Sequence, residues 1–121
     1  MAITLNHTIV PAHDKHASAK FFADIMGLKV EPSAGHFVPV KITDSLPFDF
    51  DNSTNFESHH YAFRVSDDDL EVILARVNAA GIDYFADPGH RRAGELNTYN
   101  NGRGFYFSDP NGHNLEVGTR L

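Results

Sequence analysis

Two stretches of this chain share one layout, and this internal duplication constrains the fold more strongly than any other feature of the sequence. The first stretch, LNHTIVPAHDKHASAKFFADIMGLKV, begins at residue 5, and the second, SHHYAFRVSDDDLEVILARVNAAGIDY, begins at residue 58. When the two are aligned, His7 matches His60 and Gly27 matches Gly81 at a nearly constant separation. Such self-similarity indicates a repeated structural unit. We therefore expect two copies of one supersecondary unit.

Each copy should contain one helix that follows a strand. Asp14 is suited to cap the start of the first helix, and Gly27 is suited to end it. The second helix should start at Ser66 or Asp67 and stop at Gly81. The apolar residues that recur at helical spacing are Ala17, Phe21, Phe22 and Ile25 in the first helix and Leu70, Ile73, Leu74 and Val77 in the second.

Extended runs follow each helix. They are LKVEP, HFVPVKI and LPFDF after the first helix, and IDYFADP, RGFYFS and HNLEVGT after the second. The polar connector DNSTNFES between the copies is too short for a linker between separate domains. The sequence therefore predicts an α+β protein of two βαβββ modules, about 3–52 and about 58–119, within one domain spanning residues 1–121.

Composition excludes several classes of function. The net charge of −6, with Lys and Arg scattered along the chain, leaves no basic stripe for nucleic acid. No apolar run approaches the roughly 18 residues that a membrane helix needs, and the start MAITLNHTIV does not look like a secretion signal. The absence of Cys removes disulfides and thiolate ligands. We expect a soluble, cytoplasmic protein with no nucleic acid or membrane partner.

The pair His59–His60 stands at the start of the strand HHYAFRV. Successive strand side chains point to opposite faces, so the two imidazoles cannot do the same job. His59 shares its row with the apolar residues Tyr61, Phe63 and Val65, which should pack under a helix. His60, Ala62 and Arg64 should therefore lie on the open, concave face.

The same phase argument places two more side chains on the concave face. His7 is the repeat equivalent of His60, and Glu116 alternates with the apolar residues Leu115 and Val117 in HNLEVGT. Two imidazoles and one carboxylate suit one divalent cation such as Fe, Mn, Ni, Co or Zn, and three protein ligands leave positions open for substrate. We predict a metal site formed by His7, His60 and Glu116.

The other histidines of the eight in the chain are expected at the surface. His13 and His16 lie at the start of a helix, and His36, His90 and His113 stand next to glycines in turns. A single histidine in such a place is far more often a surface residue than a metal ligand.

The motifs LNHTIV, HHYAFRV and GRGFYFSDPNGHNLEV resemble those of the vicinal oxygen chelate superfamily, which includes glyoxalases, extradiol dioxygenases, fosfomycin-resistance transferases and bleomycin-resistance proteins. The resemblance spans nearly the whole chain. It implies paired βαβββ modules that curve into a half-barrel with helices on the convex face. It also implies that His7, His60 and Glu116 stand at the positions of the family's metal ligands, in agreement with the strand phases.

The resemblance suggests further site residues. Asp49 in PFDFD stands where glyoxalase-like members carry a fourth carboxylate ligand, and it is equally compatible with a plain strand position. Tyr106 stands where related enzymes keep an active-site tyrosine. Arg103 lies at the end of the Asn- and Gly-rich segment 93–102, which is a candidate lid, and it could line the cavity or form a salt bridge at its rim. Fosfomycin-resistance members carry Thr where this chain has Ile9, which disfavours that activity.

Four functional hypotheses follow, of which the last, a scaffold protein without an activity of its own, is supported by no feature of the sequence. The first is a metal-dependent, glyoxalase-like lyase or isomerase that chelates a small oxygen-rich substrate through two neighbouring oxygens. The second is an Fe(II)-dependent extradiol-type dioxygenase at the same ligands, and the third is a non-catalytic drug-binding protein of the bleomycin-resistance type. We also expect a homodimer, because open sheet edges and an uncovered concave face favour association. Its metal sites could be shared between the chains.

Overall fold

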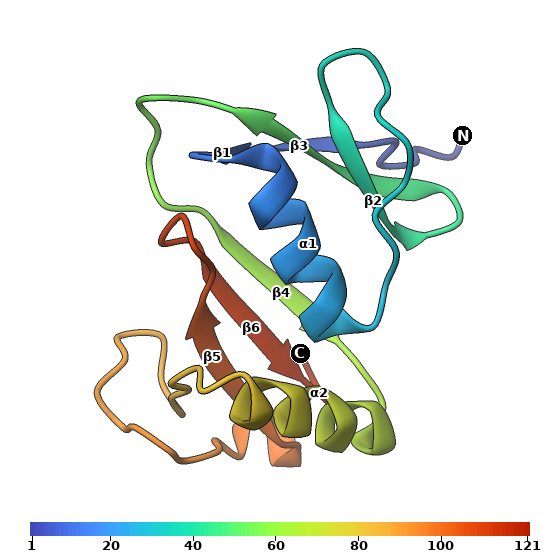
Figure 1. Ribbon diagram of the computed structural model, residues 1–121. Helices are drawn as coiled ribbons and strands as arrows, with labels where there is room; N and C mark the ends of the chain where they lie inside the picture. The colour runs from blue at the N-terminus through green and yellow to red at the C-terminus, as the bar shows by residue number, and fades with distance from the viewer. The chain divides into compact units, whose positions relative to one another are not determined.

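The computed structural model describes residues 1–121, and the chain divides into two compact units (Figure 1). Unit 1 comprises Met1–Glu57 and unit 2 comprises Ser58–Leu121. The division falls within the polar connector, and the predicted module bounds lie inside these units. The expectation that both modules form one domain stays a prediction.

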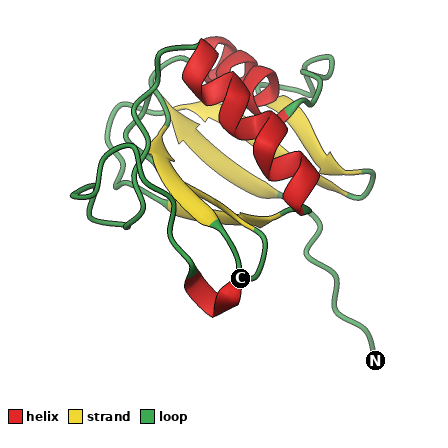
Figure 2. Cartoon of the chain, turned by 90° about the horizontal axis from the view of Figure 1, so that it is seen from below, coloured by secondary structure: helices red, strands yellow, loops and turns green.

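Unit 1 contains one helix and a three-stranded mixed sheet. Its elements are β1 (Thr8–Ala12), α1 (Lys15–Met26), β2 (Val38–Thr43) and β3 (Leu46–Asn52). The strand order is β1-β3-β2, with β3 parallel to β1 and antiparallel to β2. The residues before β1 form neither helix nor strand (Figure 2).

Unit 2 repeats this arrangement. Its elements are β4 (His60–Arg64), α2 (Asp67–Ala79), the short 3₁₀ helix η1 (Tyr99–Asn101), β5 (Gly104–Ser108) and β6 (Asn114–Gly118). The strand order is β4-β6-β5, with β6 parallel to β4 and antiparallel to β5. The duplication predicted from the sequence is therefore present in the topology, and the predicted α+β fold of two modules is confirmed.

The strand expected directly after each helix is shorter than predicted. In unit 1 it is reduced to an isolated bridge between Val30 and Val40, and in unit 2 to bridges that Phe85 makes with its neighbours. Pro32 and Pro88, which lack the N–H that a sheet ladder requires, stand at the ends of these two runs. Each regular sheet consequently has three strands.

The helix boundaries follow the predicted caps. The Asp14 carboxylate accepts hydrogen bonds from the N–H groups of His16 and Ala17, each at 3.1 Å, at the start of α1. Gly27 ends α1 in the left-handed conformation, with φ of 73°. At α2 the cap is Ser66, whose hydroxyl accepts the N–H of Asp69 at 3.1 Å.

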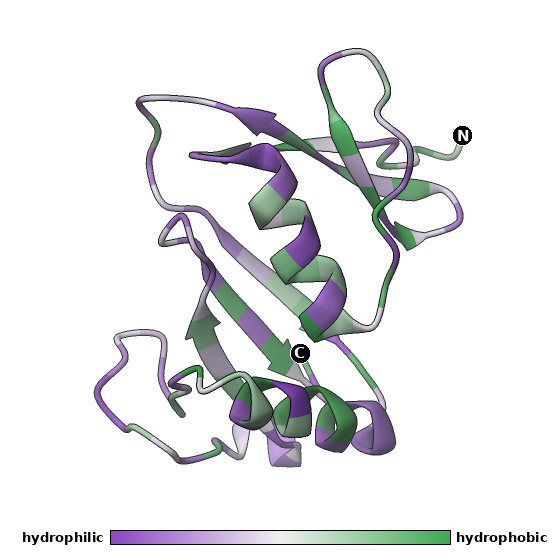
Figure 3. Cartoon of the chain, in the orientation of Figure 1, coloured by the Kyte–Doolittle hydropathy of each residue, from purple (hydrophilic) through white to green (hydrophobic).

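One face of each sheet is apolar and buried. In unit 1 the Phe22 ring of α1 lies 5.3 Å from the Phe48 ring and 5.8 Å from the Phe50 ring, so the helix covers this face. In unit 2 hydrophobic and hydrophilic residues alternate along β6 (Figure 3). The buried row there consists of Phe105, Phe107, Leu115 and Val117. The opposite face of each sheet carries the predicted site residues.

No helix of the structure is both long enough and apolar enough to cross a membrane.

Candidate functional site

The open face of the sheet in unit 2 brings His60 and Glu116 together. Glu116 of β6 pairs with Ala62 of β4 on one side and with Tyr106 of β5 on the other, so these side chains point the same way. His60 projects from the same face, and its Nε2 lies 3.0 Å from Glu116 Oε1. The Glu116 side chain is buried, whereas His60 is about half exposed. Strand alternation, visible in the sequence, produces this pair.

Tyr106 lies beside the same carboxylate. Its side chain is buried, and the loss of solvent together with a hydrogen bond to Glu116 raises the pKa of its hydroxyl well above the ordinary value. The phenol is therefore neutral at physiological pH and can donate a hydrogen bond. In the register it shares its face with Gly104 and Ser108, as the sequence predicted.

His59 lies on the other side of β4. Its Nδ1 is 2.6 Å from the Tyr61 hydroxyl, and its backbone N–H donates to Nδ1 of His113 at 2.9 Å. His113 is fully buried, so the expectation of a surface turn histidine is wrong for this residue. The Asp109 carboxylate accepts the backbone N–H of His113 at 2.8 Å and tightens the turn. In the sequence, the burial of His113 is indicated by its alternation with Leu115 and Val117, which places it in the apolar row of the strand.

The equivalent face of unit 1 carries His7 and Asp49. Asp49 of β3 pairs with Ile9 of β1, just as Glu116 pairs with Ala62 in unit 2. Both His7 and Asp49 line an open pocket of about 440 Å³. Its remaining lining residues are Asn6, Glu31, Pro32, Ala34, Pro39, Lys41 and Pro47. His7 itself is exposed, and its Nδ1 lies 2.8 Å from Asn6 Oδ1.

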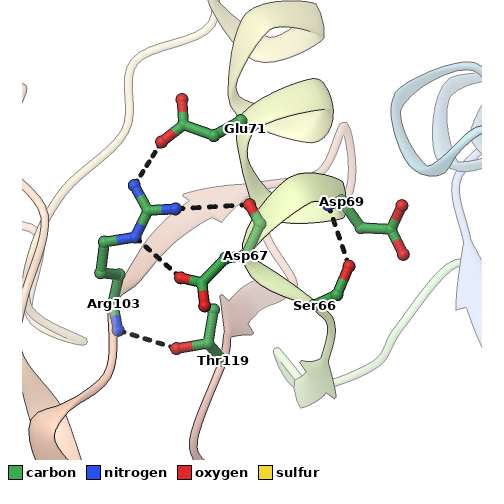
Figure 4. A network of polar contacts seen from close by, with 6 residues as sticks. All are labelled: Ser66, Asp67, Asp69, Glu71, Arg103 and Thr119. Atoms are coloured by element: carbon green, nitrogen blue, oxygen red, sulfur yellow. Dashed lines mark hydrogen bonds and ion pairs between the residues drawn. The ribbon is translucent and has the colours of Figure 1, made fainter.

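Arg103 is not brought together with Tyr106 and Glu116. Its guanidinium forms ion pairs with Asp67, at 3.1 Å, and with Glu71, both on α2 (Figure 4). Its backbone N–H donates to the Thr119 hydroxyl at 2.9 Å. Hydrogen bonds to Glu71 and Asp67 raise the pKa of Arg103 further above its ordinary value. Of the two roles left open by the sequence, the structure describes a salt bridge.

The candidate lid, residues 93–102, is anchored at Asn97. This residue is buried, and its backbone exchanges hydrogen bonds with Gly104 at 2.9 and 3.3 Å. Its side-chain amide donates to the carbonyl of Ala86 at 2.8 Å. A Cβ at position 104 would stand 3.1 Å from Asn97 Oδ1, so a larger residue there would require Asn97 to shift. Asn97 therefore fixes the middle of the segment beside β5.

The donors are divided between the two units. His60 and Glu116 belong to unit 2, whereas His7 and Asp49 belong to unit 1. Within neither unit do three His, Asp or Glu side chains gather where they could hold one metal ion. Each unit thus offers one histidine and one carboxylate.

Comparison with known proteins bears out the resemblance seen in the motifs. The model of the Glyoxalase/Bleomycin resistance protein/Dioxygenase superfamily matches residues 4–117. Glutathione transferase FosA of Serratia marcescens is 25% identical over 124 residues, which cover 97% of this chain and 81% of that protein.

Solved structures match over the whole chain. Oxidase ChaP-H2 is 54% identical with a TM-score of 0.96, covering 100% of this chain and 96% of that one. Oxidase ChaP-H1 is 47% identical with a TM-score of 0.93, covering 99% and 98%. FosX from Listeria monocytogenes, a fosfomycin resistance protein whose structure contains Mn(II), is 18% identical with a TM-score of 0.74, covering 100% and 93%. At that identity the likeness concerns the fold.

Proposed function

We propose that this chain, which belongs to the glyoxalase/bleomycin resistance protein/dioxygenase superfamily, is a metal-dependent enzyme that oxidises a small, oxygen-rich substrate with molecular oxygen. The observation that carries the reaction class is the match to two structures named as oxidases, which extends over essentially the whole chain. A shared fold alone would not support a shared reaction. The chemistry must therefore also fit the residues of the site.

The pair His60–Glu116 fits a divalent metal. Imidazole nitrogen and carboxylate oxygen are both donors that divalent metals take from proteins, and here the two atoms already lie within hydrogen-bond distance of one another. The separation between His60 Nε2 and Glu116 Oε1 is 3.0 Å. A neutral imidazole and a carboxylate together suit Fe(II), Mn(II), Co(II), Ni(II) or Zn(II). His60 and Glu116 are our proposed ligands from unit 2.

We assign His7 as the third ligand. It is exposed on the open face of unit 1 and is the repeat equivalent of His60. With His7 the proposed site has three protein ligands, a number that leaves positions open for substrate. The three ligands can belong to one chain or to two chains of a homodimer. We favour the homodimer, as the open sheet faces suggested.

A divalent metal held by these residues would supply a positively charged centre that polarises neighbouring substrate oxygens and, if redox-active, would support oxidation by O₂. Tyr106 would contact the bound substrate from the same sheet face. As a neutral phenol at physiological pH it can donate a hydrogen bond, which would stabilise negative charge that develops on a substrate oxygen. Arg103, which is held by α2, has no part in this proposal.

A lyase or isomerase of the glyoxalase type is the second candidate. The observation that favours it is the position of Asp49, which occupies in unit 1 the place that Glu116 occupies in unit 2. Asp49 would then be a fourth ligand. The two candidates differ in their need for O₂, since isomerisation consumes none.

Reconstitution under anaerobic conditions separates these candidates. The protein is purified without chelator, loaded with Fe(II) or Mn(II), and its metal content is measured by elemental analysis. Oxygen uptake is then followed with a panel of catechols, 2-hydroxyketones and thiol adducts of 2-oxoaldehydes. Oxygen consumption matched by product supports the oxidase, and turnover of an adduct without oxygen supports the lyase. A protein that binds no divalent metal would contradict both.

A further inference from the structure

His90 adopts the left-handed backbone conformation, which is uncommon for residues other than glycine. It lies in a tight turn with φ of 56°, where glycine and asparagine are the residues of lowest cost. The Asp87 carboxylate holds this turn by accepting the backbone N–H groups of Arg91 and Arg92, at 2.9 and 2.7 Å. The His90 ring stacks on Phe85, with centroids 4.4 Å apart and planes 10° apart. Because the backbone is held in a strained conformation and the ring is held by stacking, we infer that the ring has a function.

The hydrogen bonds around Asn114 define which nitrogen of His90 carries the proton. The side-chain amide of Asn114 donates from Nδ2 to the Pro88 carbonyl at 3.1 Å, which orients its Oδ1. Nε2 of His90 lies 2.8 Å from that Oδ1. An amide oxygen only accepts, so Nε2 must be the donor. In the neutral ring Nδ1 is then left as an acceptor, and the structure records no partner for it.

The His90 ring contacts the sheet face that carries the proposed metal pair, through its hydrogen bond to Asn114. Asn114 is the cross-strand partner of His60, so both side chains project from the same face of adjacent strands, which lie about 4.8 Å apart. His90 is half-buried against that face. A ligand bound at His60 and Glu116 that is long enough to pass Asn114 would meet the His90 ring.

We propose that His90, oriented by Asn114, is a specificity residue that accepts a hydrogen bond through Nδ1 from a hydroxyl or amino group of the substrate. This donor lies beyond the two oxygens that the metal would bind. The substrate class is thus narrowed to molecules that carry a third polar group, a hydrogen-bond donor, near their vicinal oxygen pair. The inference rests on the proposed function, because only the proposed metal site defines where the vicinal oxygens of the substrate would lie.

The first test measures the tautomer and needs no metal. In protein labelled with ¹⁵N-histidine, the long-range ring spectrum of His90 should show the Nε2–H tautomer, and Asn114→Ala should abolish that preference. A His90 ring protonated at Nδ1 in the wild-type protein would overturn the inference.

The second test compares two ligands that differ by one hydroxyl group. They are 4-methylcatechol and 3,4-dihydroxybenzyl alcohol, and their affinities are measured by calorimetry for the Mn(II)-loaded wild type and for His90→Asn. Asn tolerates a positive φ, so this variant keeps the turn while it removes the ring. The matched control is His16→Asn, which changes an exposed histidine of α1.

The additional hydroxyl should improve binding by about threefold to tenfold in the wild type and in His16→Asn, in line with one hydrogen bond. The improvement should disappear in His90→Asn while its metal content is unchanged. No improvement in the wild type, or the same improvement in His90→Asn, would overturn the inference. If the wild type binds no metal, the proposed function fails. The inference is then decided by whether the alcohol, and not 4-methylcatechol, shifts the ring signals of His90.

Discussion

Asp49 in β3 and Glu116 in β6 occupy the same position in two copies of one sheet register. Each carboxylate stands on the central strand of its sheet, and its partner on the parallel strand lies two residues after a histidine. The histidines are His7 and His60. The duplication therefore supplies one imidazole and one carboxylate per unit, and the two carboxylates differ in length by one methylene.

Metal binding should depend on His60 and not on its neighbour. His60→Ala removes a proposed ligand and should abolish stoichiometric binding, whereas His59→Ala should retain it because His59 faces Tyr61 on the other side of β4. Elemental analysis after loading with Mn(II) measures both variants. Loss of metal in His59→Ala, with full retention in His60→Ala, would show that the face assignment is wrong.

Mixing two inactive variants should reveal whether the sites are shared. If each site takes His7 from one chain and His60 from another, a mixed dimer of His7→Ala and His60→Ala has one intact site. Metal binding should then reappear, at about half of the wild-type amount per mixed dimer. Native mass spectrometry confirms the subunit exchange. Exchange without recovery of metal would place all three ligands in one chain.

Arg103 should contribute to stability rather than to the chemistry. Arg103→Ala removes both ion pairs to α2 and should lower the Tm by a few degrees without changing metal content or turnover. Arg103→Lys keeps the positive charge but loses the forked geometry of the guanidinium. Its Tm should therefore lie between those of the wild type and Arg103→Ala. Thermal unfolding at low and high salt measures the effect. A loss of turnover with an unchanged Tm would instead assign Arg103 to the site.

Tyr61 should make the folded protein sensitive to alkaline pH. Burial, aided by the charge of Asp109, raises the pKa of Tyr61 from 10.0 to about 12. The unfolded chain therefore loses this proton first, and the stabilising contribution is complete below pH 10 and is lost as the pH rises toward 12.

The free energy of unfolding should decline less steeply with pH in Tyr61→Phe than in the wild type, because the variant lacks the hydroxyl of Tyr61 that titrates. The decline should not vanish, since the pKa of Tyr106 is also raised. Tyr99→Phe, at an exposed position, is the matched control and should leave the slope unchanged. Urea unfolding between pH 9 and 12 measures the slopes. Equal slopes for all three proteins would contradict the prediction.

The sequence by itself determined the features that depend on local spacing. The repeat predicted two modules, Asp14 and Gly27 predicted the ends of α1, and strand alternation placed His60, Glu116 and Tyr106 on one face. Alternation and capping act over a few residues, so a linear pattern records them.

Tertiary structure decided what depends on residues far apart in the chain. Arg103 pairs with Asp67 and Glu71, and His113 is buried beneath the backbone of His59, because folding brings these segments into contact. The tautomer of His90 is set by Asn114 for the same reason. No spacing rule encodes such contacts, since the partner of a charged or polar group is whichever group the packed chain places within reach.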